Sequence, residues 1–108
     1  MKWDSLLSDL PFAPEHSAVR IRAILIHFGL KKKDFAEIAG IAPPNVTQLI
    51  KGEYAPSPAI AWRVKRALGI PGEWTLFDDW DSINEVSLRL SLLRAVAQAR
   101  VEFEESRK

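Results

Sequence analysis

The chain has 108 residues, of which 47% are hydrophobic and 27% are charged, and its formal net charge is +1. This length and composition indicate one folded domain with room for an appended helix, and they argue against disorder. The absence of cysteine excludes disulfide frameworks, thiolate zinc sites and cysteine nucleophiles. No apolar run approaches the length of a membrane span, and the N-terminus does not resemble a signal peptide. We therefore expect a soluble, cytoplasmic protein that makes no use of a membrane.

The small net charge hides a strong segregation of charge along the chain. Residues 17–70 carry nine lysines and arginines against three acidic residues, a net charge of +6, whereas residues 71–81 carry four acidic residues and no basic one. A basic block of this kind is typical of a surface that binds nucleic acid. The alternative is ordinary solvated charge on the outer faces of helices.

The first sixteen residues predict a short helix followed by a linker. Asp4 is a suitable N-cap, and Pro11 and Pro14 break the helix. The apolar residues of this helix are Trp3, Leu6, Leu7 and Leu10. A helix this short is unstable alone, so we expect it to cover the core of its own domain or, as the alternative, to pack against another chain.

Three further helices are delimited by caps, glycine and proline in the segment between residues 17 and 80. Ser17 is the expected N-cap of a helix over Ala18–Phe28, which Gly29 ends. Ser57-Pro58 predicts the start of another helix, which runs to Leu68. A last short helix is expected from Gly72 to about Asp79.

Between these elements, Lys32–Lys51 has the pattern of two short helices joined by a tight turn. Gly40 lies where the first helix must end, because glycine adopts the left-handed conformation without a steric penalty. A small Ala36 allows the two helices to cross closely. The inward-facing positions are Phe35, Ala36, Ala39, Val46 and Leu49. This is the pattern of a helix-turn-helix, whose second helix enters the major groove of DNA.

The outward positions of the second helix are the candidate base contacts. Asn45 and Gln48 carry amides that can bind adenine at two points, and Thr47 can contact a thymine methyl group. Pro43-Pro44 opens the helix, and Pro44 offers bases only apolar contact. The candidate phosphate contacts are Lys31, Lys32, Lys33 and Lys51. Three lysines at a helix N-terminus oppose the helix dipole, and a bound phosphate would remove that conflict.

The segment from Ile83 to about Arg107 predicts one long helix, for which Ser82 is the expected cap. The positions with heptad a/d spacing are Ile83, Val86, Leu90, Leu93 and Ala97. A second apolar strip contains Leu88, Leu92, Ala99 and Phe103. This helix either folds back on its own bundle or forms a dimer seam. We favour the seam, because the preceding helices are expected to close their own core.

Several short motifs occur together between Ala18 and Asp79. They are Ile21-Arg22, Phe35-Ala36 with Ala39-Gly40-Ile41, Val46 with Leu49, Lys51-Gly52, Leu68-Gly69, and Glu73-Trp74 with Leu76. In this arrangement the chain resembles the Cro/cI-type (XRE) helix-turn-helix repressors. Lys32 stands where members of that family often place a glutamine that contacts phosphate. The resemblance implies a five-helix bundle that is usually dimeric on a palindromic operator.

These observations define the expected fold, domains and function. The fold class is all-α, a five-helix lambda-repressor-like bundle with a short N-terminal helix and a long C-terminal helix. Its parts are the N-terminal segment 1–16, the DNA-binding domain 17–80 and the dimerisation or partner-binding helix 81–108. We expect a dimeric repressor that binds specific sequences in double-stranded DNA. The alternative is an antiactivator or antitoxin that binds a protein partner. No nucleophile–base pair or metal-ligand cluster suggests an enzyme or a cofactor.

Overall fold

The computed structural model describes residues 13–108, so the helix expected around Trp3–Leu10 lies outside the described part of the chain. The described residues form six α-helices and one short 3₁₀-helix, with no strand among them. The elements are α2 (Pro14–Phe28), α3 (Lys32–Ala39), α4 (Pro43–Lys51), α5 (Pro58–Leu68), α6 (Gly72–Phe77), η1 (Trp80–Ser82) and α7 (Val86–Ser106). The all-helical fold class is thus confirmed.

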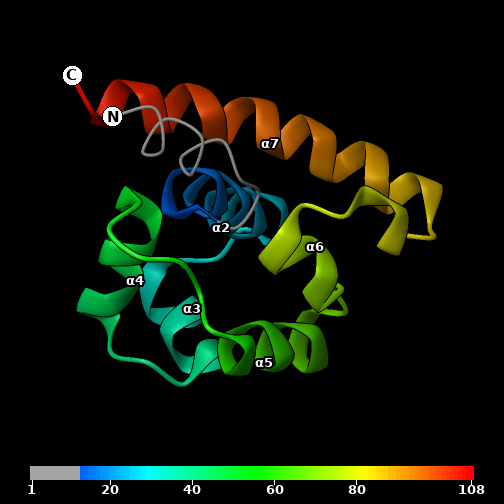
Figure 1. Ribbon diagram of the computed structural model, residues 1–108, viewed down its shortest axis with the longest axis horizontal. Coiled ribbons are helices and arrows are strands. Elements are labelled where there is room, and N and C mark those ends of the chain that lie inside the picture. Colours follow the sequence, from blue (N-terminus) through cyan, green and yellow to red (C-terminus); the bar gives the residue numbers. More distant parts are fainter. Residues whose placement is uncertain (1–12) are drawn as a thin grey trace.

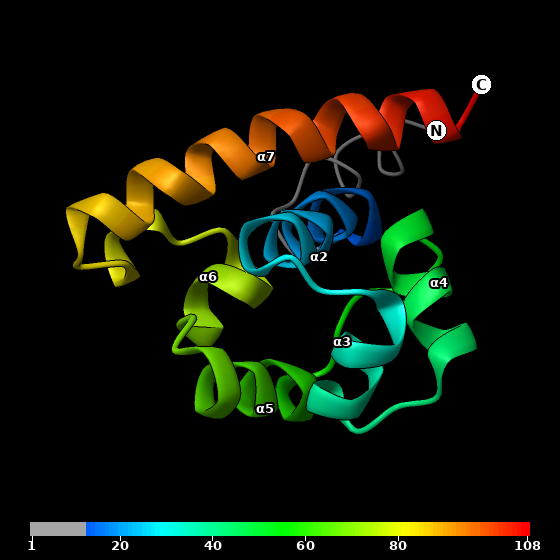
Figure 2. The ribbon, with the colours of Figure 1, turned by 180° about the vertical axis from the view of Figure 1, so that it is seen from behind.

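Helix α2 occupies the centre of the bundle (Figure 1). It contacts α4, α6 and α7, while α3 packs against α4 and α5. The view from behind shows the same order, with α7 along one side and α5 on the other (Figure 2). The side chains withdrawn completely from solvent include Ile21, Ile24, Phe35, Val46, Leu49, Val64, Ile70, Trp74, Ile83 and Leu92. The core is therefore shared by every α-helix that the structure describes.

Helix α7 packs along α2, which is one of the two arrangements that the sequence left open. Its buried residues are Leu92, Ala95, Ala99 and Phe103, which come from the second of its two apolar strips. The expectation that α2 to α6 close their own core was wrong, because these four side chains complete it. Of the predicted seam, Ile83 precedes the helix and is only 1% exposed, so it belongs to the core. Val86, Leu90, Leu93 and Ala97 remain exposed.

Two of the three predicted serine caps are wrong. Helix α2 begins at Pro14, and Ser17 lies in its first turn, where its hydroxyl donates to the Pro14 carbonyl oxygen at 3.1 Å. Ser82 belongs to η1, and Glu85 is the N-cap residue of α7. Ser57 is confirmed as the cap of α5, because its hydroxyl oxygen accepts a hydrogen bond from the Ile60 N–H at 3.2 Å. Proline in the first turn starts both α2 and α5.

Arg20 is buried and holds the end of α6 against α2. Its Nε donates to the Thr75 carbonyl oxygen at 3.0 Å, and its Nη2 donates to the Leu76 carbonyl oxygen at 3.1 Å. Burial lowers the pKa of Arg20 to about 10, and the carboxylate of Asp78 acts in the opposite direction. Asp78 itself ends α6 in the left-handed conformation at a φ of 61°. The guanidinium of Arg20 therefore stabilises the end of α6 inside the protein and adds no positive charge to the exposed surface.

Arg22 and Arg63 stabilise two other helix ends in the same way. The Nε of Arg22 donates to the Ile50 carbonyl oxygen at 2.7 Å, in the last turn of α4. The Nη1 of Arg63 donates to the Ala39 carbonyl oxygen at 3.1 Å, at the end of α3. Carbonyl groups at helix ends have no partner within the helix, and cations are favoured there by the helix dipole. Three of the nine cations counted between residues 17 and 70 thus have structural roles.

Candidate nucleic-acid interface

The turn between α3 and α4 has the predicted geometry. Gly40 ends α3 at a φ of 69°, and the N–H of Ile41 donates to the Ala36 carbonyl oxygen at 3.0 Å. The positive φ favours glycine at this position, and a Cβ on Gly40 would lie 2.9 Å from the Arg63 guanidinium, which would have to shift. Ala36 is 3% exposed, as expected of a small residue where two helices cross. The helix-turn-helix is therefore well defined.

Helix α4 turns two prolines and two polar side chains to solvent. Val46, Leu49 and Ile50 are buried on its inner side, against α2 and α3. Pro44, Gln48 and Lys51 are exposed, and their spacing of four and three residues places them in one line along the outer side. Thr47 is half-buried beside this line. The first, middle and last turns of α4 thus each present one exposed side chain in that line.

Asn45 lies at the edge of the outer face and is half-buried. Its carbonyl oxygen accepts a hydrogen bond from the Tyr54 hydroxyl at 3.0 Å. Burial, followed by the negative charge of Glu53, raises the pKa of Tyr54. No rule of sequence spacing pairs Tyr54 with a main-chain oxygen nine residues away. Tyr54 ties the turn after α4 to the first turn of this helix.

The three lysines at the start of α3 are all exposed. The first turn of this helix also contains an acidic residue, Asp34, whose charge suits the positive end of the helix dipole. The backbone N–H of Lys31 donates to the Asp34 carboxylate at 2.9 Å, and Asp34 lies in the first turn. The Asp34 carboxylate therefore accepts a hydrogen bond from one of the free N–H groups at the start of α3. Its negative charge also interacts favourably with the positive end of the helix dipole, so no bound phosphate is needed there. Lys32 and Lys33 remain available to an external anion.

Fewer of the basic side chains of the domain are free to face a ligand than the composition suggested. With Arg20, Arg22 and Arg63 bonded to carbonyl groups, the other cations of this segment are Lys31, Lys32, Lys33, Lys51, Lys65 and Arg66, all of them exposed. Arg66 lies over the ring of exposed Trp62 on α5, with its guanidinium carbon 4.8 Å from the ring centroid. Four lysines on α4 and at the start of α3 therefore supply the positive charge of the helix-turn-helix.

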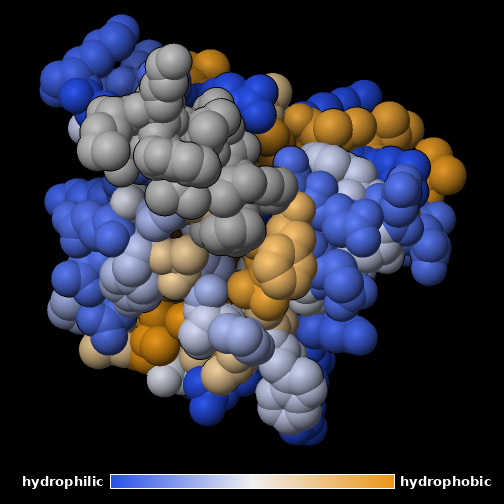
Figure 3. Space-filling model, in the orientation of Figure 1, coloured by the Kyte–Doolittle hydropathy of each residue, from blue (hydrophilic) through white to orange (hydrophobic). Residues whose placement is uncertain are grey.

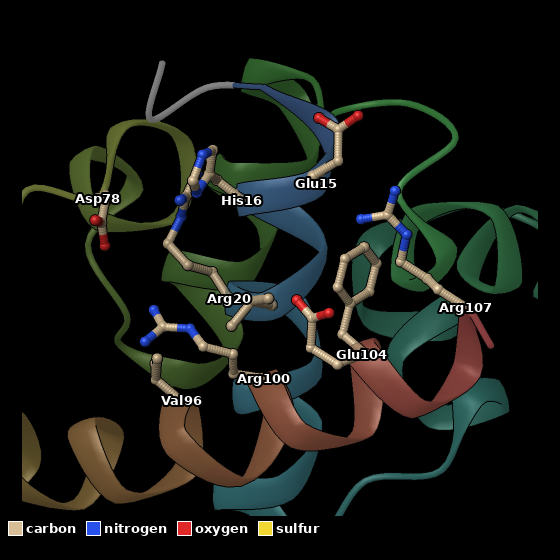
Figure 4. A pocket seen from close by; sticks show the side chains of 10 residues that line it. Glu15, His16, Arg20, Asp78, Val96, Arg100, Glu104 and Arg107 are labelled. Atoms are coloured by element: carbon tan, nitrogen blue, oxygen red, sulfur yellow. The ribbon is translucent and has the colours of Figure 1, made fainter. Parts of the chain in front are cut away.

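A pocket of about 450 Å³ lies between the first turns of α2 and the C-terminal half of α7 (Figure 4). Arg20 and Arg100 line one part of it, and Glu15 and Glu104 line another. Because these charges oppose one another and Arg20 already donates to α6, we assign no ligand to the pocket. Within residues 13–108, no cluster of three or more histidine or acidic side chains is arranged to hold a metal ion.

The fold and the exposed outer face of α4 define a helix-turn-helix protein. A helix-turn-helix family model matches residues 21–74, which is half of the chain. The chain belongs to this XRE-type family of DNA-binding regulators, and the resemblance seen in its sequence is confirmed. We found no match to the chain among curated proteins or among solved structures. In the described part of the chain, no helix has the length and apolar character needed to cross a membrane.

Proposed function

We propose that the chain is a dimeric repressor that binds a specific DNA sequence through α4. The observation that carries this proposal is the exposed line of Pro44, Gln48 and Lys51 on a helix whose other side is buried. A protruding helix of this size fits the major groove, where side chains can reach base edges.

Base contacts and phosphate contacts are assigned to different parts of this surface. Gln48 is exposed and can bind adenine at two points, with Thr47 and Asn45 beside it and Pro44 in apolar contact. Lys31, Lys32 and Lys33 at the start of α3, together with Lys51, would position the protein on phosphates. A dimer formed through Val86, Leu90, Leu93 and Ala97 would present two such surfaces to a palindromic operator.

The function is tested by selecting bound sequences from a random DNA pool and measuring the affinity for the selected duplex. The expected result is a recovered inverted repeat whose binding weakens steeply with salt, with a slope of about −0.9 for each neutralised phosphate. A shuffled duplex of the same composition is the control. If the protein bound no DNA at low salt, the proposed function would be wrong.

A second candidate is an antiactivator or antitoxin that uses the same bundle to hold a protein partner. Its support is the exposure of both Pro43 and Pro44 on the leading turn of α4, since prolines cannot donate a hydrogen bond to a base. The exposed strip on α7 offers further apolar surface for a partner. Recovery of a stoichiometric partner from host extract, together with failure to bind DNA, would favour this candidate.

A further inference from the structure

Helix α5 exposes one large aromatic side chain and three cations, and the helix contains no acidic residue. Trp62 is 56% exposed, and the guanidinium carbon of Arg66 lies 4.8 Å from the centroid of its six-membered or fused ring system. Arg63 and Lys65 are exposed as well. None of these side chains belongs to the proposed base contacts or phosphate contacts. The outer surface of α5 is therefore available for another role.

An open groove of about 420 Å³ lies where α5 packs on α3. Its lining residues are Ile38, Trp62, Arg63, Arg66 and Ala67, and we call it the α3–α5 groove. Ile38, Ala67 and the indole of Trp62 supply its apolar surface. The Nη1 of Arg63 donates to the Ala39 carbonyl oxygen at 3.1 Å, which holds that guanidinium at the end of α3. The groove thus combines apolar surface with positive charge.

The stacking of Arg66 on Trp62 prepares both side chains for binding. A guanidinium over an aromatic face is attracted by the ring, while the N–H groups at its edge can still donate to a carboxylate. Two side chains that already restrain each other lose less conformational freedom when a partner arrives. Tryptophan and arginine are also enriched among the residues that dominate the binding energy of protein interfaces.

The charge of this surface defines the chemistry of its occupant. Within residues 13–108, no acidic side chain forms an ion pair with Arg63, Lys65 or Arg66. An acidic occupant would supply the missing negative charge, whereas a basic one would be repelled. The apolar lining requires an apolar side chain in addition. The phosphate backbone of duplex DNA provides the charge but no such side chain.

We propose that the α3–α5 groove binds an acidic segment of a partner protein. An apolar side chain of that segment would lie against Ile38 and Trp62, and a carboxylate beside it would accept hydrogen bonds from Arg66. Lys65, the neighbour of Arg66 in the chain, adds to the attraction. This inference goes beyond the proposed function and does not depend on DNA binding.

The position of the groove allows a partner and DNA to be held together. Its lining comes from α3 and α5, and Ile38 lies near the C-terminal end of α3, away from Lys32 and Lys33 at the start. Helix α5 runs along the side of the bundle opposite α7 (Figures 1 and 2). In the orientation of Figure 1, the most hydrophobic surface gathers over α7, whereas the surface over α5 mixes hydrophobic and hydrophilic side chains (Figure 3). A mixed surface of this kind suits a segment that carries both apolar and acidic groups.

Selection from a library of short random peptides, displayed on phage and exposed to the full chain, tests the proposal. The expected result is a set of enriched sequences in which aspartate or glutamate flanks a large apolar residue. If no sequence were enriched, or if the enriched sequences lacked acidic residues, the proposal would be wrong.

Variants of the groove are then titrated with a synthetic peptide of the enriched sequence. Arg66→Glu and Trp62→Ala should each weaken its binding by about tenfold or more. Both side chains are exposed, so urea unfolding should show a fold of nearly unchanged stability. Arg94→Glu makes the same change of charge on an exposed part of α7 and is the matched control, which should bind the peptide as wild type does. Equal losses for Arg66→Glu and Arg94→Glu would overturn the proposal.

A reversal of charge separates direct contact from a structural effect. The same peptide with lysine in place of its acidic residues should bind Arg66→Glu several-fold more tightly than it binds wild type. No such gain would refute the contact between a carboxylate and Arg66.

Two other occupants have different signatures. If duplex DNA displaced the peptide, and Arg66→Glu lowered the affinity for selected and shuffled duplexes equally, the groove would be a phosphate contact. If Trp62→Ala changed the oligomeric state in sedimentation, the groove would join copies of the chain. Either result would overturn the proposal. Failure of wild type to bind any DNA would refute the proposed function alone, because the peptide measurements do not involve DNA.

Discussion

Two leucines of α7 provide a matched test of how this helix is packed. Leu92 is fully buried against the bundle, whereas Leu90, two residues earlier, is 54% exposed. Substitution of either residue by alanine removes the same atoms from the same helix and changes helix propensity equally. Any difference between Leu92→Ala and Leu90→Ala therefore reports only the face on which each side chain lies.

The expected difference is large compared with the total stability of a domain of this size. Replacing a fully buried leucine by alanine costs about 3 to 4 kcal/mol, since the transfer term is joined by a cavity term. At Leu90 the loss in the monomer should stay below about 1 kcal/mol, because half of the side chain is already in water. With an m-value of about 1.5 kcal/mol/M, the urea midpoint falls by about 2 to 2.7 M for Leu92→Ala and by less than about 0.7 M for Leu90→Ala.

The assay is urea unfolding at several protein concentrations. The loss caused by Leu92→Ala should not depend on concentration, whereas the loss caused by Leu90→Ala should grow with concentration if the exposed strip on α7 joins two copies. Equal losses for the two variants at low concentration would contradict the packing of α7 on α2. The helix would then stand free of its own bundle.

Three further outcomes follow from other features of the structure. Arg20→Met should destabilise the fold by about 3 kcal/mol because it leaves buried carbonyl groups unpaired, while exposed Arg94→Met should cost less than about 0.5 kcal/mol in the same unfolding assay. Equal effects would contradict the role of Arg20 at the end of α6. Gly29→Ala should cost about 1 kcal/mol for its positive φ alone, and Gly40→Ala should cost measurably more, since its Cβ would meet Arg63 at 2.9 Å. Similar losses at both glycines would mean that Arg63 yields freely. Lys51→Ala should reduce the salt slope of DNA binding by about 0.9, and an unchanged slope would remove Lys51 from the phosphate contacts.

The helix-turn-helix could be predicted from sequence because its determinants are local. The positive φ of Gly40, the small Ala36 and the inward spacing of Val46 and Leu49 are all fixed within twenty residues. Proline in the first turn likewise located the starts of α4 and α5. The helix caps predicted at Ser17 and Ser82 were wrong because other residues begin those helices. Pro14 begins α2, and Ser82 lies in η1, which precedes α7.

The partners of the arginines depend on contacts far apart in the chain and could not be predicted. Arg20 reaches carbonyl groups 55 and 56 residues away, and Arg22 reaches one 28 residues away. Composition therefore overstated the positive charge that faces solvent. Helix α7 posed a different problem, because it carries two apolar strips and periodicity alone does not say which one the bundle covers. The larger side chain of Phe103, which packs by Gly52 at the end of α4, belongs to the buried strip.

The contact between Gln48 and a base is the central claim, and one binding measurement tests it most directly. Wild type and Gln48→Ala are titrated against the selected duplex and against a shuffled duplex at the same salt concentration. Loss of an amide bound to adenine at two points should cost about 1 to 3 kcal/mol, so affinity for the selected duplex should fall roughly 5- to 150-fold. Affinity for the shuffled duplex should stay unchanged. An equal loss on both duplexes, or no loss on either, would show that the outer face of α4 does not recognise DNA sequence through Gln48.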